Sequence, residues 1–168
     1  MGLGVLFAID KKQEKALLSC ESDDELVDYI ETIEEEWDRN WLCDTDKSWD
    51  AIHRCFCGGD LELCCGKPPL NSVIFGGNFL NESSSYYVSL KDNKLVKQIA
   101  NEILHITQED LRKLYGNITD DYIGEKNEDD FQYTWDNFEE INEFYKKVAL
   151  TNRSVIFTVD SIDFLSEY

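Results

Sequence analysis

The sequence predicts a single α+β domain, and three observations lead to that prediction. The chain has 168 residues, which is enough for one hydrophobic core but too few for two comfortable ones. Apolar runs typical of strands stand near both ends, at residues 2–9 and 154–159, with several amphipathic helical patterns between them. The two runs can share a sheet only if the chain folds back on itself. We therefore expect residues 1–168 to form a small sheet that includes the N- and C-terminal strands, packed with five or six helices.

Three helical patterns follow the first strand in the first half of the chain. An aspartate cap predicts a short helix over residues 10–20. Ser22 and Glu25 match a capping box, and an apolar stripe at helical spacing runs on from it to residue 37. A third helix is expected over residues 46–57, with its cap at 44–46 and its end at a double glycine.

The second half of the chain predicts further helices and two strands. Residues 70–75 favour a short helix or a strand, and residues 86–90 and 154–159 favour strands. A polar, acidic loop is expected over residues 117–130. Helical patterns cover residues 95–104, 107–116, which open on a capping-box pattern, and 135–149.

The charge balance narrows the range of partners. The chain has 35 acidic and 16 basic residues, a formal net charge of -19, and 20 of the acids lie within residues 21–38 and 120–143. Such a surface repels phosphate backbones and anionic lipid heads, so we expect no direct nucleic-acid binding and no membrane binding. It would attract a basic protein, although acidity that only keeps the protein soluble is the simpler interpretation.

We expect no targeting signal and no membrane span that would route the chain out of the cell. Its start lacks a basic region before the apolar run, and no apolar stretch reaches 18 residues. We expect a cytoplasmic location, and six reduced cysteines follow from it.

A cysteine-rich stretch raises the question of a metal site. His53 is followed by Cys55, Cys57 and the adjacent pair 64–65. Structural zinc sites favour Cys-x-x-Cys, which is not present, and Cys55 and Cys57 lie about 200° apart on a helix. We therefore predict no metal ligands and no cofactor. One arrangement stays open: His53, Cys57 and one of the later cysteines could meet if the helix unwinds at Gly58.

The sequence predicts no catalytic residue either. Nucleophilic catalysis needs an activated Cys or Ser beside a base, and the only histidines are His53 and His105. His53 shares one helical face with Trp49, Ile52 and Phe56, which is typical of a core or pocket residue. Glycines occur in pairs, without a phosphate-cradling loop.

Several features occur in a characteristic order along the chain. They are the MG start with its apolar strand, Asp46-Lys47-x-Trp49-Asp50-x-x-His53, Pro69-Leu70, Gly76-Gly77, Tyr86-Tyr87 ahead of VKQIANEIL, and Phe144-Tyr145 before SVIFTV. Together they make the chain similar to the YfbM-like family, a bacterial family of unknown function. The resemblance implies a single α+β domain and a cytoplasmic bacterial protein. It implies no activity, cofactor or catalytic residue, and the four cysteines at positions 55–65 are not part of it.

Three functional hypotheses follow from the sequence. The first is a non-catalytic acidic protein-interaction module, such as an immunity-type inhibitor of a basic toxin. The second is a small-molecule-binding protein or enzyme, whose pocket would be lined by Trp49, Asp50, His53, Gly76 and Gly77. A His53 that is sealed in the core and bonded to backbone would count against this pocket. The third is metal binding by the cysteine-rich stretch.

Overall fold

A five-stranded antiparallel sheet forms the centre of the molecule. The computed structural model of the chain describes residues 2–63, 65–81 and 86–160. The strand order is β2-β1-β5-β4-β3, and Leu6 of β1 lies opposite Phe157 of β5. The two terminal strands therefore share one sheet, as the sequence predicts, and they are neighbours in it. The strands are β1 (Gly4–Ile9), β2 (Leu42–Asp46), β3 (Asn78–Phe79), β4 (Tyr86–Lys91) and β5 (Ser154–Asp160).

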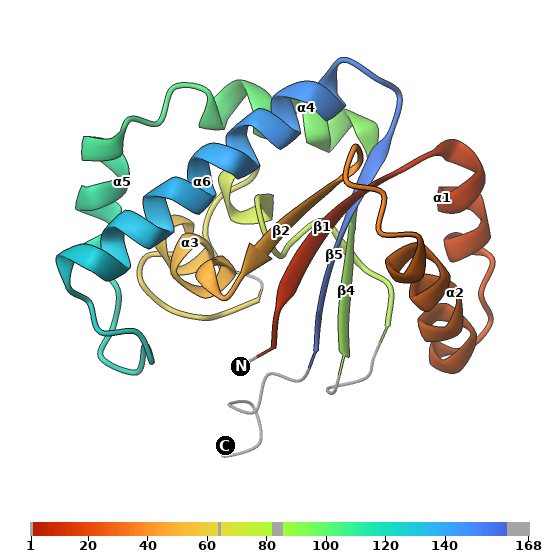
Figure 1. The fold of residues 1–168 in the computed structure, drawn as a ribbon, viewed down its shortest axis with the longest axis horizontal. Helices are drawn as coiled ribbons and strands as arrows, with labels where there is room; N and C mark the ends of the chain where they lie inside the picture. Colours follow the sequence, from red (N-terminus) through yellow and green to blue (C-terminus); the bar gives the residue numbers. More distant parts are fainter. Residues whose placement is uncertain (1, 64, 82–85, 161–168) are drawn as a thin grey trace.

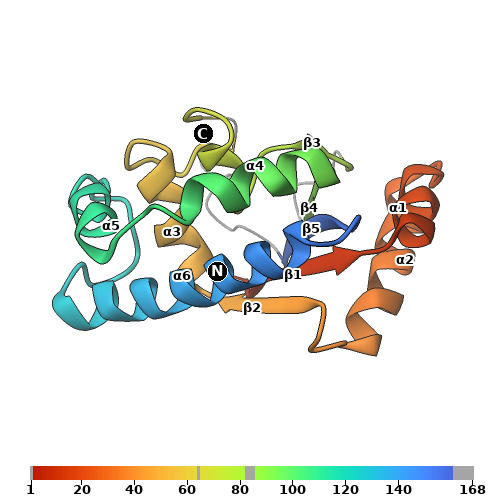
Figure 2. The same ribbon diagram turned by 90° about the horizontal axis from the view of Figure 1, so that it is seen from above.

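Helices cover both faces of this sheet. In Figures 1 and 2 the pair α1 and α2 lies on one side of the strands, whereas α3 to α6 lie on the other. The α+β class is confirmed, with a three-layer arrangement. The helices are α1 (Lys11–Leu18), α2 (Asp23–Glu36), α3 (Ser48–Phe56), α4 (Asn93–Ile103), α5 (Gln108–Tyr115) and α6 (Glu128–Ala149), and a 3-10 turn, η1, spans Leu70–Ser72.

Strand alternation divides the apolar residues into two cores. Successive side chains of a strand point to opposite faces of the sheet. In β1, Leu6 and Ala8 join the larger core under α3 to α6. Val5, Phe7 and Ile9 join the smaller core under α1 and α2. Both faces of the central strands are thus buried, which explains why residues 4–9 are an unbroken apolar run.

The helix starts follow the capping patterns of the sequence. Asp10 and Gln13 form a complete capping box at α1, and Thr107 and Asp110 form another at α5. At α2 only half of the predicted box is made. Ser22 accepts the backbone N–H of residue 25, but the carboxylate of Glu25 instead accepts the backbone N–H of residue 21.

Two short strands and two helix starts differ from the predictions. Residues 42–46 form β2 rather than the cap of a helix: Cys43 and Thr45 are buried and alternate with exposed Asp44 and Asp46. Strand β3, with two residues, was not predicted, and residues 70–75 contain only the turn η1. Helix α6 begins at residue 128, inside the expected loop, because Asn127 caps it. Among the described residues, no helix is long and apolar enough to cross a membrane.

Candidate functional site

Helix α3 is the most buried helix of the molecule and carries three of the five predicted site residues. All nine of its residues are buried. The indole of Trp49 packs edge-on against Phe75, with ring centroids 5.5 Å apart. Its Nε1 donates to the carbonyl of Gly2 at 3.0 Å. Trp49 therefore acts as an anchor between α3 and the start of β1, and it is fully enclosed.

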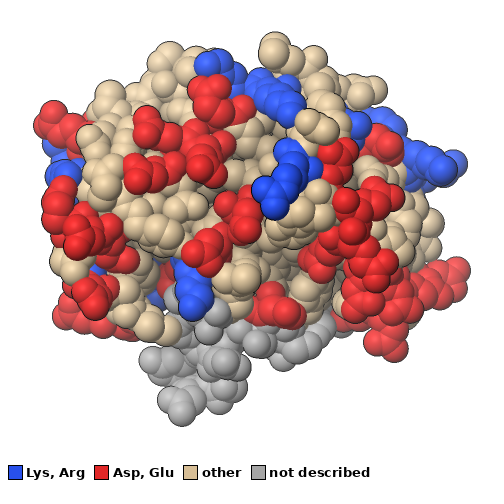
Figure 3. Space-filling model, viewed as in Figure 1, with Lys and Arg blue, Asp and Glu red and all other residues tan. Residues whose placement is uncertain are grey.

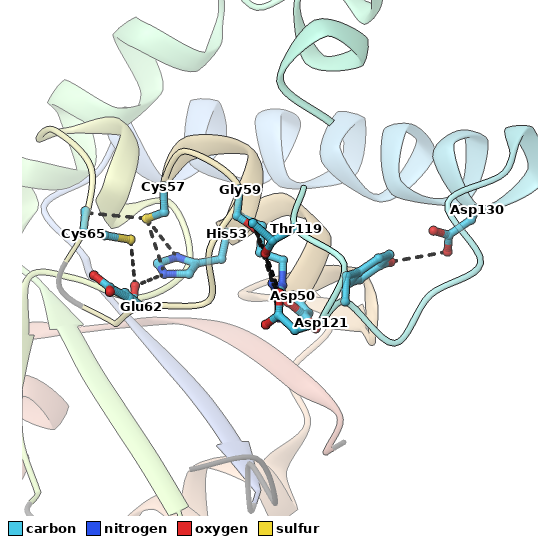
Figure 4. Close-up of polar contacts among 11 residues, drawn as sticks. Asp50, His53, Cys57, Gly59, Glu62, Cys65, Thr119, Asp121 and Asp130 are labelled. Carbon is cyan, nitrogen blue, oxygen red and sulfur yellow. Dashed lines mark hydrogen bonds and ion pairs between the residues drawn. The ribbon is translucent and has the colours of Figure 1, made fainter. Parts of the chain in front are cut away.

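Asp50 belongs to a charged network around a fully buried arginine (Figure 4). Arg54 Nε donates to Asp50 Oδ1 at 2.6 Å, and both side chains have no exposed surface. The other end of the guanidinium makes two 3.0 Å bonds to Asp121, whose side chain is 66% exposed. Arg54 Nη1 also donates to Thr119 Oγ1 at 3.1 Å. The guanidinium thus ties α3 to the segment that precedes α6.

The pKa shifts in this network indicate that it has a structural role. Hydrogen bonds from Arg54 and Thr119 lower the pKa of Asp121 to about 2. Burial raises the pKa of Asp50, and the adjacent Arg54 opposes that rise. Removing one partner of a buried pair typically costs about 3–5 kcal/mol, because the other charge is left uncompensated. The aspartate of the Trp-Asp-x-x-His pattern is therefore bound to an internal partner rather than directed at a ligand.

His53 is sealed in the core. Its side chain is 1% exposed, and Nε2 lies 2.8 Å from the carbonyl oxygen of Glu62. The ring packs edge-on against Phe75 at 5.0 Å. Burial lowers the pKa of His53 to about 4, so the imidazole is neutral at physiological pH. This burial and this backbone contact count against the small-molecule pocket.

Gly76 and Gly77 lie elsewhere, in a turn at the surface ahead of β3. Both have positive φ values, 78° and 70°, which favour glycine. A Cβ atom at Gly77 would stand 2.4 Å from the carbonyl oxygen of Leu90, so the turn approaches β4 closely. Among the described residues, the five predicted ones therefore occupy a core helix and a turn.

Two cysteines of the cysteine-rich stretch do meet His53. Cys57 Sγ lies 3.5 Å from His53 Nε2, and the Cys65 thiol donates to the carbonyl oxygen of Glu62 at 2.8 Å. One ligand atom from each of the three side chains lies within 4.8 Å of the others. Figure 4 shows both sulfurs beside the ring of His53. Cys55 is not in this group, and Cys64 lies outside the described residues.

This grouping is the arrangement that the sequence analysis left open. Helix α3 ends at Phe56, Cys57 is its C-cap, and the chain then reverses through the double glycine. The signal in the sequence was the i,i+4 spacing of His53 and Cys57 directly before those glycines. Where residue 65 lies depends on the loop after them, which periodicity does not describe.

Lys91 is a buried amine that sequence reasoning missed. It stands on the inward face of β4 and has no exposed surface. Its Nζ donates to the carbonyl of Ile74 and to Ser89 Oγ, and it lies 5.6 Å from the centre of the Phe157 ring. Burial lowers its pKa well below the ordinary value. The only signal was position: residues 87, 89 and 91 share one face of the predicted strand.

The two acidic clusters differ in how their carboxylates are used. Helix α2 buries Leu26, Ile30 and Ile33 and contains no basic residue. Figure 3 shows a dense group of carboxylates where Figure 1 places α2. The cluster at 120–143 begins at the opposite end of the molecule. Five of its ten acids, Asp120, Asp121, Glu128, Asp130 and Glu143, are bonded to Arg54, Arg112, Lys126, Lys146 and two tyrosines.

The fold and these sites define a three-layer α+β protein whose predicted site residues are largely core residues. The chain belongs to the family described as Domain of unknown function (DUF1877), whose model matches residues 1–158. Its structure is similar to "The Crystal Structure of a Protein of Unknown Function YfbM from Escherichia coli", with a TM-score of 0.67 and 18% sequence identity. That match covers 94% of this chain and 99% of the other, and at this identity it shows the fold alone. No curated protein matches the chain.

Proposed function

We propose that the protein is a non-catalytic, acidic protein-interaction module that binds a basic protein through the outer face of α2. One observation carries the proposal: this face presents six exposed carboxylates on a helix without a lysine or arginine. We call it the α2 acidic face and define it by the residues Asp24, Glu25, Asp28, Glu31, Glu35 and Glu36.

The second acidic cluster supports this choice by contrast. Asp121 binds the buried Arg54, and Glu128 makes two 2.7 Å bonds to Arg112. Asp130 accepts from the hydroxyl of Tyr115. These carboxylates hold the segment at 117–127 and the start of α6 in place. The other acids of α6 share that helix with Lys146 and Lys147, whereas α2 contains no basic residue.

The α2 acidic face also has an energetic cost that favours a functional role. Pairs such as Asp24 with Asp28 and Glu31 with Glu35 are i,i+4 neighbours of like charge, which destabilise a helix. Glu35 and Glu36 stand at the negative end of the helix dipole. A basic partner would relieve this repulsion, and the same field would accelerate its encounter with the protein.

The partner class that fits this chemistry is a basic toxin, for example a nuclease with a cationic surface for nucleic acid. The protein would then act in the cytoplasm as an immunity-type inhibitor that offers carboxylates in place of phosphates. The alternative pocket at Trp49, Asp50 and His53 gains no support, because all three side chains are enclosed and have internal partners.

The test compares two triple variants with the same net charge. The first, Asp28→Asn/Glu31→Gln/Glu35→Gln, neutralises one stripe of the α2 acidic face. The control, Asp129→Asn/Glu139→Gln/Glu140→Gln, neutralises three exposed acids of α6. The wild type and each variant are purified from the native host together with the proteins bound to them, at about 50 mM and at about 0.5 M salt. Screening weakens the attraction between surface charges at the higher concentration.

We expect the wild type and the α6 control to retain one basic protein stoichiometrically at low salt. The α2 variant should release it. The purified partner should then lose its own activity when the wild-type chain is added. Equal loss from both variants would mean that net charge alone is responsible, and retention by all three chains would exclude the α2 acidic face.

A further inference from the structure

The cluster of His53, Cys57 and Cys65 offers a binding chemistry that the acidic face does not. An imidazole and two thiols converge between the end of α3 and the loop that follows it (Figure 4). Imidazole and thiolate together are the ligands that zinc and other thiophilic d¹⁰ ions select.

The distances suit a tetrahedral ion. Zinc binds sulfur at about 2.3 Å and imidazole nitrogen at about 2.0–2.1 Å, so two ligands of a tetrahedral site stand roughly 3.5–3.8 Å apart. Cys57 Sγ and His53 Nε2 already lie 3.5 Å apart. The three ligand atoms all lie within 4.8 Å of one another, so closing the site requires any two of them to approach by no more than about 1.3 Å.

The backbone is built to bring the loop onto the helix end. Gly66 has a positive φ of 74°, and a Cβ there would stand 2.5 Å from the carbonyl oxygen of Phe56. Asn71 Nδ2 donates to the carbonyl of Cys65 at 2.9 Å, which fixes the residue that carries the third ligand. Because α3 is wholly buried, His53 and Cys57 have little freedom to move away. The site is therefore organised by the fold before an ion binds.

The two thiols differ in solvent exposure, and the more exposed one gives an ion a route into the site. Cys57 is buried, whereas Cys65 is partly exposed. Both His53 Nε2 and the Cys65 thiol now point at the carbonyl oxygen of Glu62, each at 2.8 Å. An ion that enters from the side of Cys65 would replace the two thiol protons. Because the carbonyl oxygen of Glu62 only accepts, His53 Nε2 carries the hydrogen of this contact, and that hydrogen would move to Nδ1 when Nε2 binds the ion.

We propose that His53, Cys57 and Cys65 form a binding site for Zn²⁺ or a similar thiophilic ion, with the fourth position taken by solvent. Binding is a ligand exchange: the ion gains one imidazole and two thiolates, and two protons leave per ion. The ion would link α3 to Cys65.

Cobalt titration of the reduced chain, purified without a histidine tag and treated with a chelator, tests the site. Co²⁺ should bind at one equivalent with the charge-transfer and d–d bands of a tetrahedral thiolate site. Zn²⁺ should displace it and raise the unfolding temperature. Cys65→Ser is the main variant, because its partly exposed side chain should not disturb the core. It should weaken binding beyond the roughly 10–100-fold that loss of an outer-shell partner costs.

Two controls make the assignment specific. Cys20→Ser lies beyond the sheet near α1 and keeps a hydroxyl in place of the thiol that donates to the carbonyl of Ala16, so binding should be unchanged. Cys64→Ser tests the neighbouring cysteine and should bind as the wild type does. Absence of a one-equivalent cobalt spectrum in the wild type would overturn the proposal. So would loss of binding in Cys64→Ser together with full binding in Cys65→Ser.

Discussion

Lys91 places an amine in the core, and burying that amine lowers the stability of the folded protein. Its amine has only a carbonyl, a hydroxyl and an aromatic face as partners among the described residues. Burial lowers the pKa of this amine well below the ordinary value, so the folded state favours the neutral form of the amine. The unfolded chain keeps the proton up to about pH 10.4, so unfolding takes up a proton over the range between the two pKa values.

Replacing Lys91 with methionine should therefore stabilise the protein at neutral pH. Lys91→Met removes the cost of burying the amine while filling a similar volume, and we expect a gain on the order of 1–2 kcal/mol. The sign of the pH dependence follows from the lowered pKa: wild-type stability should rise as the pH approaches the unfolded value of about 10.4 from below, by up to ~1.4 kcal/mol per unit. The variant should lose that part of the slope. A series of urea unfolding curves from neutral to alkaline pH measures both effects.

The matched control is Lys94→Met, which removes an exposed ammonium from the first turn of α4. It changes the net charge equally and should leave the pH slope as it is in the wild type. A Lys91→Met protein that is less stable, with an unchanged slope, would mean that the bond to Ile74 outweighs the cost of burial.

At the scale of single residues, the sequence could place His53 in an apolar stripe but could not name its neighbours. Helical spacing predicts the shared face with Trp49, and both are indeed buried. The contact with Cys65 arises across a loop that contains left-handed glycines. Periodicity describes regular elements, so a site closed by an irregular loop is beyond its reach.

Among the elements, α2 combines favourable and unfavourable charges along its length. Acids in its first turn suit the positive end of the helix dipole, whereas those in its last turn oppose the negative end. The helix persists because Leu26, Ile30 and Ile33 pack against the sheet. Tertiary packing thus outweighs an electrostatic cost that the proposed partner would remove.

Charge reversal at the two ends of α2 should have opposite effects on stability. Glu35→Lys places a cation in the last turn, four residues after Glu31 and so at the favourable i,i+4 spacing for an ion pair. We therefore expect a gain of about 0.5–1 kcal/mol. Asp24→Lys puts a cation in the first turn and should cost a similar amount. Thermal unfolding at low salt measures both. Effects of the same sign would show that the helix dipole does not govern this helix.

The accuracy of the element predictions depended on caps and on strand length. Asp10, Thr107 and the apolar runs at both ends mark elements that the structure confirms. β2 was missed because its acids at 44 and 46 resemble helix caps, although they are the exposed half of an alternating strand. The start of α6 was missed because its first turn is acidic, like the loop that precedes it. The same polar residue types occur in helix caps, edge strands and loops. Only the tertiary context distinguishes these positions.

For the whole molecule, the net charge of -19 is carried mainly by accessible side chains, because Asp50 is the only buried carboxylate among the described residues. The exposed ion pairs, such as Lys113 with Glu109, contribute little to stability in water. Repulsion among the remaining acids acts at longer range and is screened by salt. Net repulsion should therefore dominate the electrostatic part of the unfolding free energy.

Stability should consequently rise when NaCl increases from about 0.01 M to about 0.1 M, as the screening length falls from about 30 Å to about 10 Å. We expect a gain of about 1 kcal/mol in the free energy of unfolding, measured by urea titration at constant pH. The variant Asp28→Asn/Glu31→Gln/Glu35→Gln should start from a higher stability and gain less, because part of the repulsion is already gone. A wild-type protein that loses stability with salt would instead show that its surface ion pairs outweigh the repulsion. The α2 acidic face would then impose no cost for a basic partner to relieve.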